Sequence, residues 1–347
     1  MYGVHFQLSS RFQMVNNPLY IVFEVTTDCN LNCSYCYNHW KCNESFEKLN
    51  SYRKAKSALN QIFNTANVKQ ITFSGGEPFL SERFLELVLF CRLNKRNVSV
   101  ISNGNAGKTD DYTKLVKLGV RLFQFPFLSK KPIVHDSLTR VSGSWANSLT
   151  SILDVLLLGG IVVPVIVLTK KNYNDIEETL TFLRDIGISR IMLNRYNIGG
   201  EGVRFNDLSL NKTDLVKAFS IANNFAAKFK IQISSNVCTP HCVLDPSSFP
   251  NISFANCSQD LSRRPITINI NGDVRLCNHS PIIAGNIFNN TMNEILNSDY
   301  CKSWSLIKPD YCNSCSLYND CMGGCRAASE QMGLTLNHVD PILEILK

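Results

Sequence analysis

The sequence has no run of 18 uninterrupted apolar residues. Its strongest apolar stretch, residues 152–168, is broken by Asp154, Gly159, Gly160 and Pro164, so a membrane-spanning helix is not expected. The first 17 residues lack the basic-then-apolar order of a signal peptide, and we therefore expect a cytoplasmic protein. Net charge is only +7, from 35 basic and 28 acidic residues, which does not predict nucleic-acid binding. No internal repeat or low-complexity tract is present, and the 44% apolar content suits an ordinary globular core.

Cysteine, in contrast, is abundant, with 14 residues in 347. That frequency exceeds what is usual for a cytosolic enzyme and falls short of a disulfide-stapled miniature protein. In a reducing compartment, clustered thiols indicate metal or cofactor ligands before disulfides. Four cysteines lie between residues 29 and 42 and nine between residues 238 and 325. The remaining one, Cys91, falls in an apolar helical segment and is predicted to be a core thiol.

Short β-branched runs alternate with helical segments over the first two thirds of the chain. The predicted strands are 19–25, 69–74, 98–102, 120–125, 161–168 and 189–194, and the predicted helices are 51–65, 81–95, 109–118, 144–158, 174–186 and 211–229. Strands that alternate with helices of this length predict βα units around a parallel sheet. Six strands fit a partial (β/α)6 TIM barrel rather than a closed eight-stranded one, so the fold class is α/β.

The pattern changes after residue 231. A Ser-, Asn-, Pro- and Cys-rich stretch is predicted to be a linker, and a β-hairpin is expected to turn at Asn271-Gly272. One helix is expected near 290–304, ahead of a dense cysteine run. The predicted organisation is an N-terminal extension (1–18), a barrel core (19–230), a linker (231–256) and a small cysteine-rich domain with a hairpin and short helices (257–347).

Three cysteines follow the first strand in a C-x3-C-x2-C spacing: Cys29, Cys33 and Cys36. In barrel folds, the loops at the carboxyl ends of the strands carry the chemistry. Three thiolates on one loop can hold three irons of a four-iron cluster and leave the fourth iron open to a small molecule. The spacing therefore indicates an iron–sulfur site with an open coordination position.

The segment CNLNCSYC, with Tyr35 at its aromatic position, resembles the signature of the radical SAM superfamily. The resemblance implies a [4Fe–4S] cluster whose open iron binds S-adenosylmethionine (SAM). It also implies reductive cleavage of SAM to methionine and a 5′-deoxyadenosyl radical, which abstracts a hydrogen atom from the substrate. In such enzymes the protein orients the cofactor and excludes water.

Further segments resemble that superfamily in the expected order, including ITFSGGEPFL and VHDSLTRVSGSW. The residues that the resemblance assigns to SAM are Tyr35, Ser74, Gly75, Gly76, Glu77, Ser102, Asn103, Arg140 and Leu193. It implies that Glu77 accepts from the SAM ammonium, that Arg140 pairs with the SAM carboxylate, and that the backbone near Leu193 contacts adenine. One departure is Pro126, which stands where a SAM-contacting Ser is usual; Ser129 is the candidate substitute.

The C-terminal third resembles the SPASM extension of radical SAM enzymes. Cys257, Gly272 and Cys277 match its first half, and Cys312, Cys315, Cys321 and Cys325 match its second half; its final cysteine is missing. The resemblance implies two auxiliary [4Fe–4S] clusters. Cys257, Cys277 and Cys325, with Cys238 or Cys242, would hold the first, and Cys312, Cys315 and Cys321 the second. The second cluster's fourth ligand is open between His338, Asp340 and no protein ligand. A four-thiolate zinc site is the rival interpretation.

Radical SAM enzymes with a SPASM extension mostly modify peptides or proteins, so the resemblance implies a maturase that cross-links or otherwise modifies a ribosomally made peptide. A sulfatase-maturating enzyme is the alternative, but Asn278 stands where that group carries a proton-accepting Asp, which leaves His279 as a weak catalytic candidate. An alternative of another class is a non-catalytic iron–sulfur carrier.

The expected partners follow from the same resemblance. About 18 residues precede the first predicted strand, too few for a leader-peptide-binding domain. Either a separate protein presents the peptide or the enzyme recognises its substrate directly, and a reductant such as flavodoxin or ferredoxin would supply electrons. Neither nucleic acid nor membrane is expected as a partner.

Overall fold

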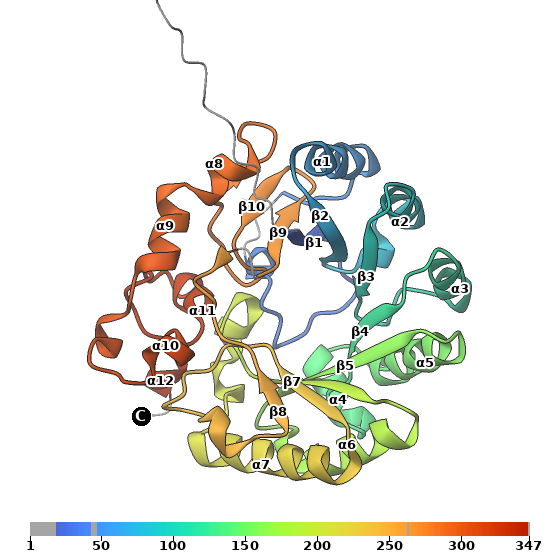
Figure 1. Ribbon diagram of the computed structural model, residues 1–347. Coiled ribbons are helices and arrows are strands. Elements are labelled where there is room, and N and C mark those ends of the chain that lie inside the picture. Colours follow the sequence, from blue (N-terminus) through green and yellow to red (C-terminus); the bar gives the residue numbers. More distant parts are fainter. Residues whose placement is uncertain (1–18, 43–46, 262–263, 346–347) are drawn as a thin grey trace, which may run out of the picture.

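A computed structural model describes residues 19–42, 47–261 and 264–345, and the predicted N-terminal extension lies outside them. Its centre is one sheet of eleven strands in the order β11-β10-β9-β1-β2-β3-β4-β5-β6-β7-β8. The strands curve around an open middle that the loop after β1 crosses (Figure 1). The expected partial barrel is therefore present.

The six predicted strands are all found and pair in parallel. They are β1 (Leu19–Thr26), β2 (Val68–Gly75), β3 (Asn97–Ile101), β4 (Leu122–Pro126), β5 (Ile161–Leu168) and β6 (Arg190–Arg195). The segment predicted as a linker adds two more parallel strands, β7 (Gln232–Ser235) and β8 (Ile252–Phe254). Both are short, and for that reason the period-2 signal was too brief to read from the sequence.

Helices cover the outside of the sheet (Figure 1). They are α1 (Tyr52–Thr65), α2 (Phe84–Leu93), α3 (Thr109–Lys117), α4 (Pro132–Thr139), α5 (Ser144–Leu157), α6 (Ile176–Asp185) and α7 (Lys212–Phe229). Helix α1 shows the logic. The Ser51 side chain caps it by accepting from the Lys54 amide, and Ala55, Leu59 and Ile62 are buried against the sheet because they fall on one helical face.

The C-terminal region extends the sheet on its other side. Strand β9 (Ile266–Asn269) pairs in parallel with β1, and β10 (Asp273–Arg275) and β11 (Gly285–Asn286) follow antiparallel. The predicted hairpin turns as expected at Gly272, whose φ is +83°. The single helix expected near 290–304 is wrong: α8 (Met292–Leu296) and α9 (Asp299–Leu306) are separate because the Ser298 side chain caps a new helix by accepting from the Cys301 amide. Helices α10 (Tyr318–Cys321), α11 (Arg326–Gln331) and α12 (Ile342–Ile345) complete the chain.

Alternation along the strands divides apolar from polar groups. Ile21, Phe23 and Val25 are buried in the main core, whereas the intervening Glu24 forms a buried ion pair with Arg275. That pair fastens β10 to β1. The ion pair therefore lies on the face of β1 opposite to these three side chains.

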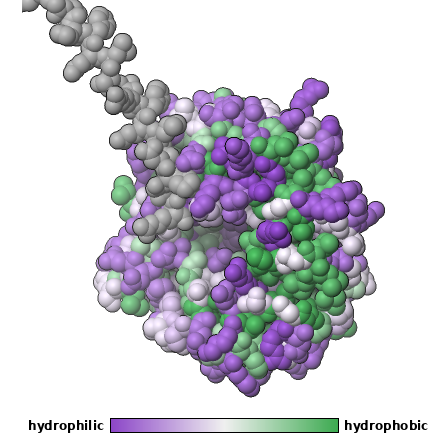
Figure 2. Space-filling model, turned by 45° about the vertical axis from the view of Figure 1, so that its right-hand side comes forward, coloured by the Kyte–Doolittle hydropathy of each residue, from purple (hydrophilic) through white to green (hydrophobic). Residues whose placement is uncertain are grey.

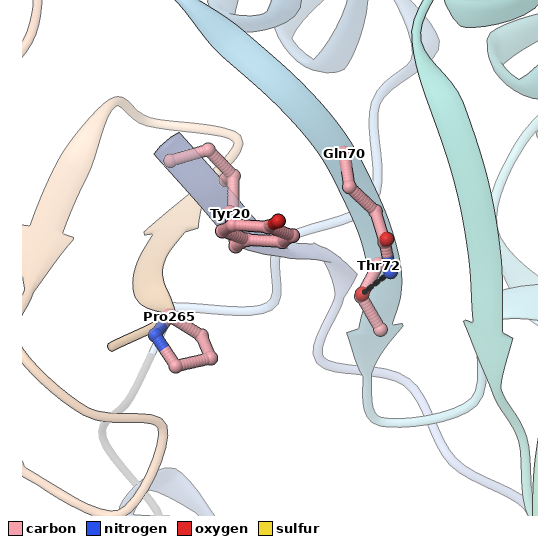
Figure 3. Close-up of a pocket in the computed structure, with 5 residues that line it drawn as sticks. Tyr20, Gln70, Thr72 and Pro265 are labelled. Atoms are coloured by element: carbon pink, nitrogen blue, oxygen red, sulfur yellow. Dashed lines mark hydrogen bonds between the residues drawn. The ribbon is translucent and has the colours of Figure 1, made fainter. Parts of the chain in front are cut away.

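A cavity of about 300 Å³ opens at the amino ends of β1 and β2. Figure 3 shows Tyr20, Gln70, Thr72 and Pro265 around it, with Gln70 donating to Thr72 at 3.4 Å. No residue assigned to SAM or iron lines it, because those residues follow the opposite, carboxyl ends of the strands. Figure 2 shows a depression near the middle of another view of the molecule, with hydrophilic residues along much of its rim. In the part of the chain that is described, no helix has the length and apolar character needed to cross a membrane.

Candidate functional site

The loop after β1 places Cys29, Cys33 and Cys36 together at the carboxyl end of the barrel. All three thiols are half-buried, and the charges of Cys29 and Cys36 both act on Cys33. Burial raises the pKa of Cys33 above its ordinary value, so a bound cation is needed to favour its thiolate form. The hydroxyl of Tyr35 lies beside Cys33.

Neighbouring segments hold this loop by its backbone. The Ser34 amide donates to the Leu138 carbonyl at 2.9 Å. The Tyr196 hydroxyl donates to the Ser34 carbonyl at 3.2 Å. Gly200 approaches so closely that a Cβ there would lie 2.5 Å from the Cys36 carbonyl oxygen. The loop is thus braced from β6 and from the end of α4, and sequence reasoning missed Tyr196 and Gly200 because neither belongs to a recognisable motif.

Glu77 is the buried carboxylate of the predicted SAM site. It is fully buried and accepts from the Ser102 hydroxyl at 2.9 Å and from the Asn103 amide at 2.6 Å. Burial raises its pKa to about 7, although the hydrogen bonds from Asn103, Phe79 and Ser102 oppose that rise. A cationic or amino group that approached this carboxylate would restore its charged form.

The two glycines before Glu77 bring the end of β2 against the loop that carries Cys29, Cys33 and Cys36. The Gly76 amide donates to the Thr26 carbonyl at 2.7 Å. A Cβ on Gly75, whose φ is +129°, would lie 2.2 Å from that carbonyl oxygen, and one on Gly76 would lie 2.1 Å from the Asp28 carbonyl oxygen. Only glycine fits at these positions. Ser74, just before them, is buried.

Three other predicted SAM residues lie at the carboxyl ends of the strands or beyond. Arg140 follows α4 and faces Glu201, with 3.3 Å between its Nη1 and the Glu201 carboxylate. The Leu193 side chain is completely buried in the main core. Only its backbone is therefore available for the predicted contact with adenine. The Ser129 hydroxyl accepts from the Lys131 amide just before α4.

A second group of thiols lies beside the barrel: Cys238, Cys257, Cys277 and Cys325, here called the first auxiliary set. Cys238 is hydrogen-bonded to Cys257, and Cys325 and Cys277 act on it electrostatically. The structure therefore selects Cys238, rather than Cys242, as the upstream member of this set. The His279 amide donates to Cys277 at 3.4 Å, and the Asn197 side chain donates to Cys325 at 3.4 Å.

Arginines surround the first auxiliary set. The hydrogen bond from Cys238, together with Arg264 and Arg326, holds the pKa of Cys257 well below its ordinary value. Arg264 approaches the Cys257 sulfur to 3.9 Å. Arg195 forms a fully buried ion pair with Asp340, whose carboxylate also accepts from the Cys325 amide at 2.8 Å. The arginines thus favour the thiolate of Cys257. The pKa of Cys238 is raised, chiefly by its hydrogen bond to Cys257, and burial raises the pKa values of Cys277 and Cys325.

A third group consists of Cys242, Cys312, Cys315 and Cys321, here called the second auxiliary set. Burial raises the pKa of Cys242, and the nearby Cys321 and Cys315 raise it further. Burial also raises the pKa of Cys312, and Cys321, Cys315 and Cys242 add to that rise. All four line one cavity of about 200 Å³.

The two loops that carry the SAM-site and first auxiliary thiols are in direct contact. Tyr37, which follows Cys36, stacks on His279, with ring centroids 4.0 Å apart and an interplanar angle of 17°. The Asn278 side chain donates to the Tyr37 hydroxyl at 2.9 Å. Gln331 on α11 donates to the carbonyls of both Tyr37 and His279 at 2.7 Å. Gln331 is another residue that no sequence pattern indicated.

The predicted catalytic candidate His279 is poorly suited to accept a proton. Burial, with the nearby charges of Arg195 and Arg275, lowers its pKa to about 3. Its Nδ1 lies 2.7 Å from the Asn197 side-chain nitrogen. The ring is therefore neutral and engaged on both its face and its edge.

The described thiols are not arranged as ligands of a single metal ion. Thirteen cysteines have described side chains, and none of these thirteen is part of a disulfide. Within the described ranges, no three His, Cys, Asp or Glu side chains converge as closely as one metal ion requires. Thiolates on one zinc ion, each about 2.3 Å from it, crowd together, whereas a four-iron cluster spaces its ligands because each binds a different iron.

Comparisons with known proteins agree with this arrangement. Residues 23–183 match the radical SAM superfamily, and residues 257–322 match SPASM, an iron-sulfur cluster-binding domain. The PqqA peptide cyclase of Gluconobacter oxydans is 23% identical over 94% of this chain and 91% of its own length. An uncharacterised protein of Methanocaldococcus jannaschii is 26% identical over 51% of this chain, and the match spans 63% of that relative.

The fold also has a solved counterpart. Streptococcus suis SuiB, in its crystal structure with the precursor peptide SuiA, superposes with a TM-score of 0.71 at 16% identity. The match covers 94% of this chain and 76% of SuiB. At this identity the likeness concerns the fold, which therefore confirms the predicted barrel with a C-terminal extension.

Proposed function

Because the chain carries a radical SAM domain followed by a SPASM domain, we propose that it matures a ribosomally made peptide by cross-linking or otherwise modifying its side chains or α-carbons. A [4Fe–4S] cluster on Cys29, Cys33 and Cys36, with SAM, supplies radical hydrogen abstraction there. The relatives support a peptide as the substrate class, since one is named a peptide cyclase and SuiB binds a precursor peptide.

The chain's own residues bind and orient SAM in this proposal. Glu77 accepts from its amino group, held in place by Ser102 and Asn103. Arg140 exchanges its contact with Glu201 for the SAM carboxylate. Gly75 and Gly76 bring the backbone close without a side chain in the way.

The observation that carries the proposal is the Tyr37–His279 stack. It joins the loop of Cys36 to the loop of Cys277, so the predicted site of hydrogen abstraction and the first auxiliary set lie on loops that touch. Forming a new bond on a radical substrate leaves one electron to remove, and an adjacent cluster can accept it. A non-catalytic carrier would need neither the buried Glu77 network nor this contact.

The proposal also covers partners and location. A flavodoxin or ferredoxin would reduce the SAM-site cluster, and the peptide would be presented by a separate leader-binding protein or recognised by this chain directly. We place the protein in the cytoplasm, where reducing conditions preserve its free thiols.

Formylglycine formation on sulfatases is the weaker alternative. Its proton acceptor would have to be Asn278 or His279. An amide does not accept a proton, and Asn278 is donating to Tyr37, while His279 has a pKa of about 3.

The test is anaerobic turnover with SAM, dithionite and a short precursor peptide encoded beside the gene. We expect 5′-deoxyadenosine together with a modified peptide. Loss of two hydrogens per event would indicate cross-linking, and an unchanged mass with altered stereochemistry would indicate epimerisation. The proposal would be refuted if protein with intact clusters produced no 5′-deoxyadenosine and no modified peptide.

A further inference from the structure

We propose that Cys242 is the fourth thiolate ligand of the second auxiliary cluster, in place of the downstream cysteine that the sequence lacks. The inference deepens the proposed function and rests on its assignment of iron–sulfur clusters to the SPASM domain. Cys242 lies 70 residues before Cys312 in the chain. Both nevertheless line the same cavity of about 200 Å³, together with Cys315 and Cys321.

Three independent contacts fix the turn that carries Cys242. The amide of its neighbour His241 donates to the Cys321 sulfur at 3.3 Å. The Lys212 ammonium, at the start of α7, donates to the Cys242 carbonyl at 2.9 Å. Val243 and Leu244 are buried in the main core. The thiol is thus held at the cavity by the barrel on one side and by the second auxiliary set on the other.

The other three thiols are held by a compact reversal of the chain. The Cys315 amide donates to the Cys312 carbonyl at 3.1 Å, and Cys321 ends α10. Met322, Gly323 and Gly324 then all adopt positive φ. This left-handed run turns the chain away from the cavity and carries Cys325 to the first auxiliary set.

The rival ligands are occupied elsewhere. Asp340 pairs with Arg195 and accepts from the Cys325 amide, which places it at the first auxiliary set. His338 accepts at Nδ1 from the Thr335 amide at 3.2 Å. Neither lines the cavity of the second set.

Four thiolates would complete the coordination of all four irons, so no iron would be open to substrate. The second auxiliary cluster would then serve only to transfer electrons. Cys242 and Cys315 are exposed, so this cluster would lie at the surface, where a reductant can approach it.

The test measures iron in a background that lacks the SAM-site cluster. The parent is the variant with Cys29→Ala, Cys33→Ala and Cys36→Ala, which should hold about 8 iron per chain in two clusters. Cys242→Ala and Cys242→Ser are added to it separately. Cys301→Ala is the matched control, because Cys301 is a buried thiol of the same domain that faces Ser298 and Arg264. His338→Ala tests the rival ligand.

We expect Cys242→Ala to lower the iron content to about 4, or to about 7 if a three-iron cluster forms, with a changed EPR spectrum. Cys242→Ser should keep the iron, because an oxygen can replace the thiolate, but should shift the reduced-cluster EPR signal. Cys301→Ala and His338→Ala should both match the parent. Unchanged iron and unchanged EPR signals in both Cys242 variants would overturn the inference. It would also be overturned if His338→Ala lost a cluster while the Cys242 variants kept theirs.

These readouts involve neither SAM nor peptide. Failure of the ligand assignment would therefore appear in the iron and EPR data of the parent background. Failure of the proposed function would appear in the peptide assay of the unaltered protein.

Discussion

The backbone amide of Asn103 donates a 2.6 Å hydrogen bond to a carboxylate oxygen of Glu77. The Asn103 side chain also lies 3.6 Å from the Cys29 sulfur. Asn103, which follows β3, therefore contacts both the predicted acceptor of the SAM amino group and a predicted iron ligand. A displacement of Glu77 would therefore be transmitted through Asn103 to Cys29, and the reverse.

Glu77 makes SAM affinity depend on pH. Binding an amino group favours the carboxylate, so the contribution of Glu77 is present above its pKa of about 7 and is lost as the pH falls through that value. Between pH 6 and pH 8 the charged fraction rises about tenfold. We expect the ratio of SAM dissociation constants, Glu77→Gln over wild type, to rise by up to about tenfold over that range in anaerobic calorimetry.

Titration of SAM itself affects both proteins equally and cancels in that ratio. A ratio that stayed constant from pH 6 to pH 8 would show that Glu77 does not contact the SAM amino group.

Cys29, Cys33 and Cys36 should be separable from the other thiols. Replacing any one with Ala removes a ligand of the SAM-site cluster, whereas the auxiliary sets lie on other loops. We expect iron to fall from about 12 to about 8 per chain and production of 5′-deoxyadenosine from SAM and dithionite to stop. Wild-type production in such a variant would refute the site assignment.

Gly75 and Gly187 form a matched pair. Both have positive φ, +129° and +94°, but a Cβ on Gly75 would lie 2.2 Å from a backbone oxygen and one on Gly187 would meet nothing within 4 Å. Gly187→Ala should cost about 1 kcal/mol of stability through its dihedral alone and leave SAM binding intact. Gly75→Ala should displace the end of β2 and reduce SAM affinity by at least about tenfold. Equal SAM affinity in the two variants, measured by equilibrium dialysis, would contradict this reading.

Local sequence patterns predicted the six barrel strands and most of the covering helices, because those elements are long enough to show their period. The eight-residue helix α4 was not predicted. Helix α1 begins one residue from its predicted start, and β5 spans the predicted residues. The motif residues also fall where expected, since Glu77 and Cys29 each follow the carboxyl end of a strand. Local sequence patterns do not record which distant segments of the chain pair with one another.

The auxiliary thiols show this limit. Cys238 and Cys242 are four residues apart, yet they belong to different sets, and only the path of the chain around Pro240 separates them. Asp340 was a candidate iron ligand by position, but its partner is Arg195 on β6, 145 residues away. Such contacts depend on how the C-terminal region docks on the barrel, which no local period records.

The Arg195–Asp340 pair should be a strong structural contact. Both side chains are almost completely buried, and Asp340→Asn would leave the Arg195 charge without its partner. Breaking a buried pair in this way costs about 3–5 kcal/mol. We expect a corresponding fall in the guanidinium midpoint under anaerobic conditions, with loss of iron from the first auxiliary set.

Asp185→Asn is the control for that experiment, because Asp185 pairs with Arg184 on the surface. An exposed pair contributes at most about 1 kcal/mol. Similar midpoints for the two variants would show that the buried pair carries no special stability.

His279 should act through its ring surface rather than as a base. It stacks on Tyr37, and its pKa of about 3 leaves it neutral over the working pH range. His279→Phe keeps a flat ring in the stack, whereas His279→Ala removes it. We expect His279→Phe to retain peptide turnover within about fivefold and His279→Ala to lose at least about tenfold more, since one aromatic contact contributes about 1 kcal/mol and a cavity adds to the cost.

Uncoupled SAM cleavage separates this effect from damage to the SAM site, and it should be unchanged in both His279 variants. The pH profile of peptide turnover should likewise be the same in wild type and His279→Phe, because the imidazole does not titrate there. If His279→Phe were as inactive as His279→Ala, and its pH profile lost a limb that wild type shows, the imidazole would be exchanging protons with the substrate. The balance would then shift towards the formylglycine chemistry that Asn278 otherwise disfavours.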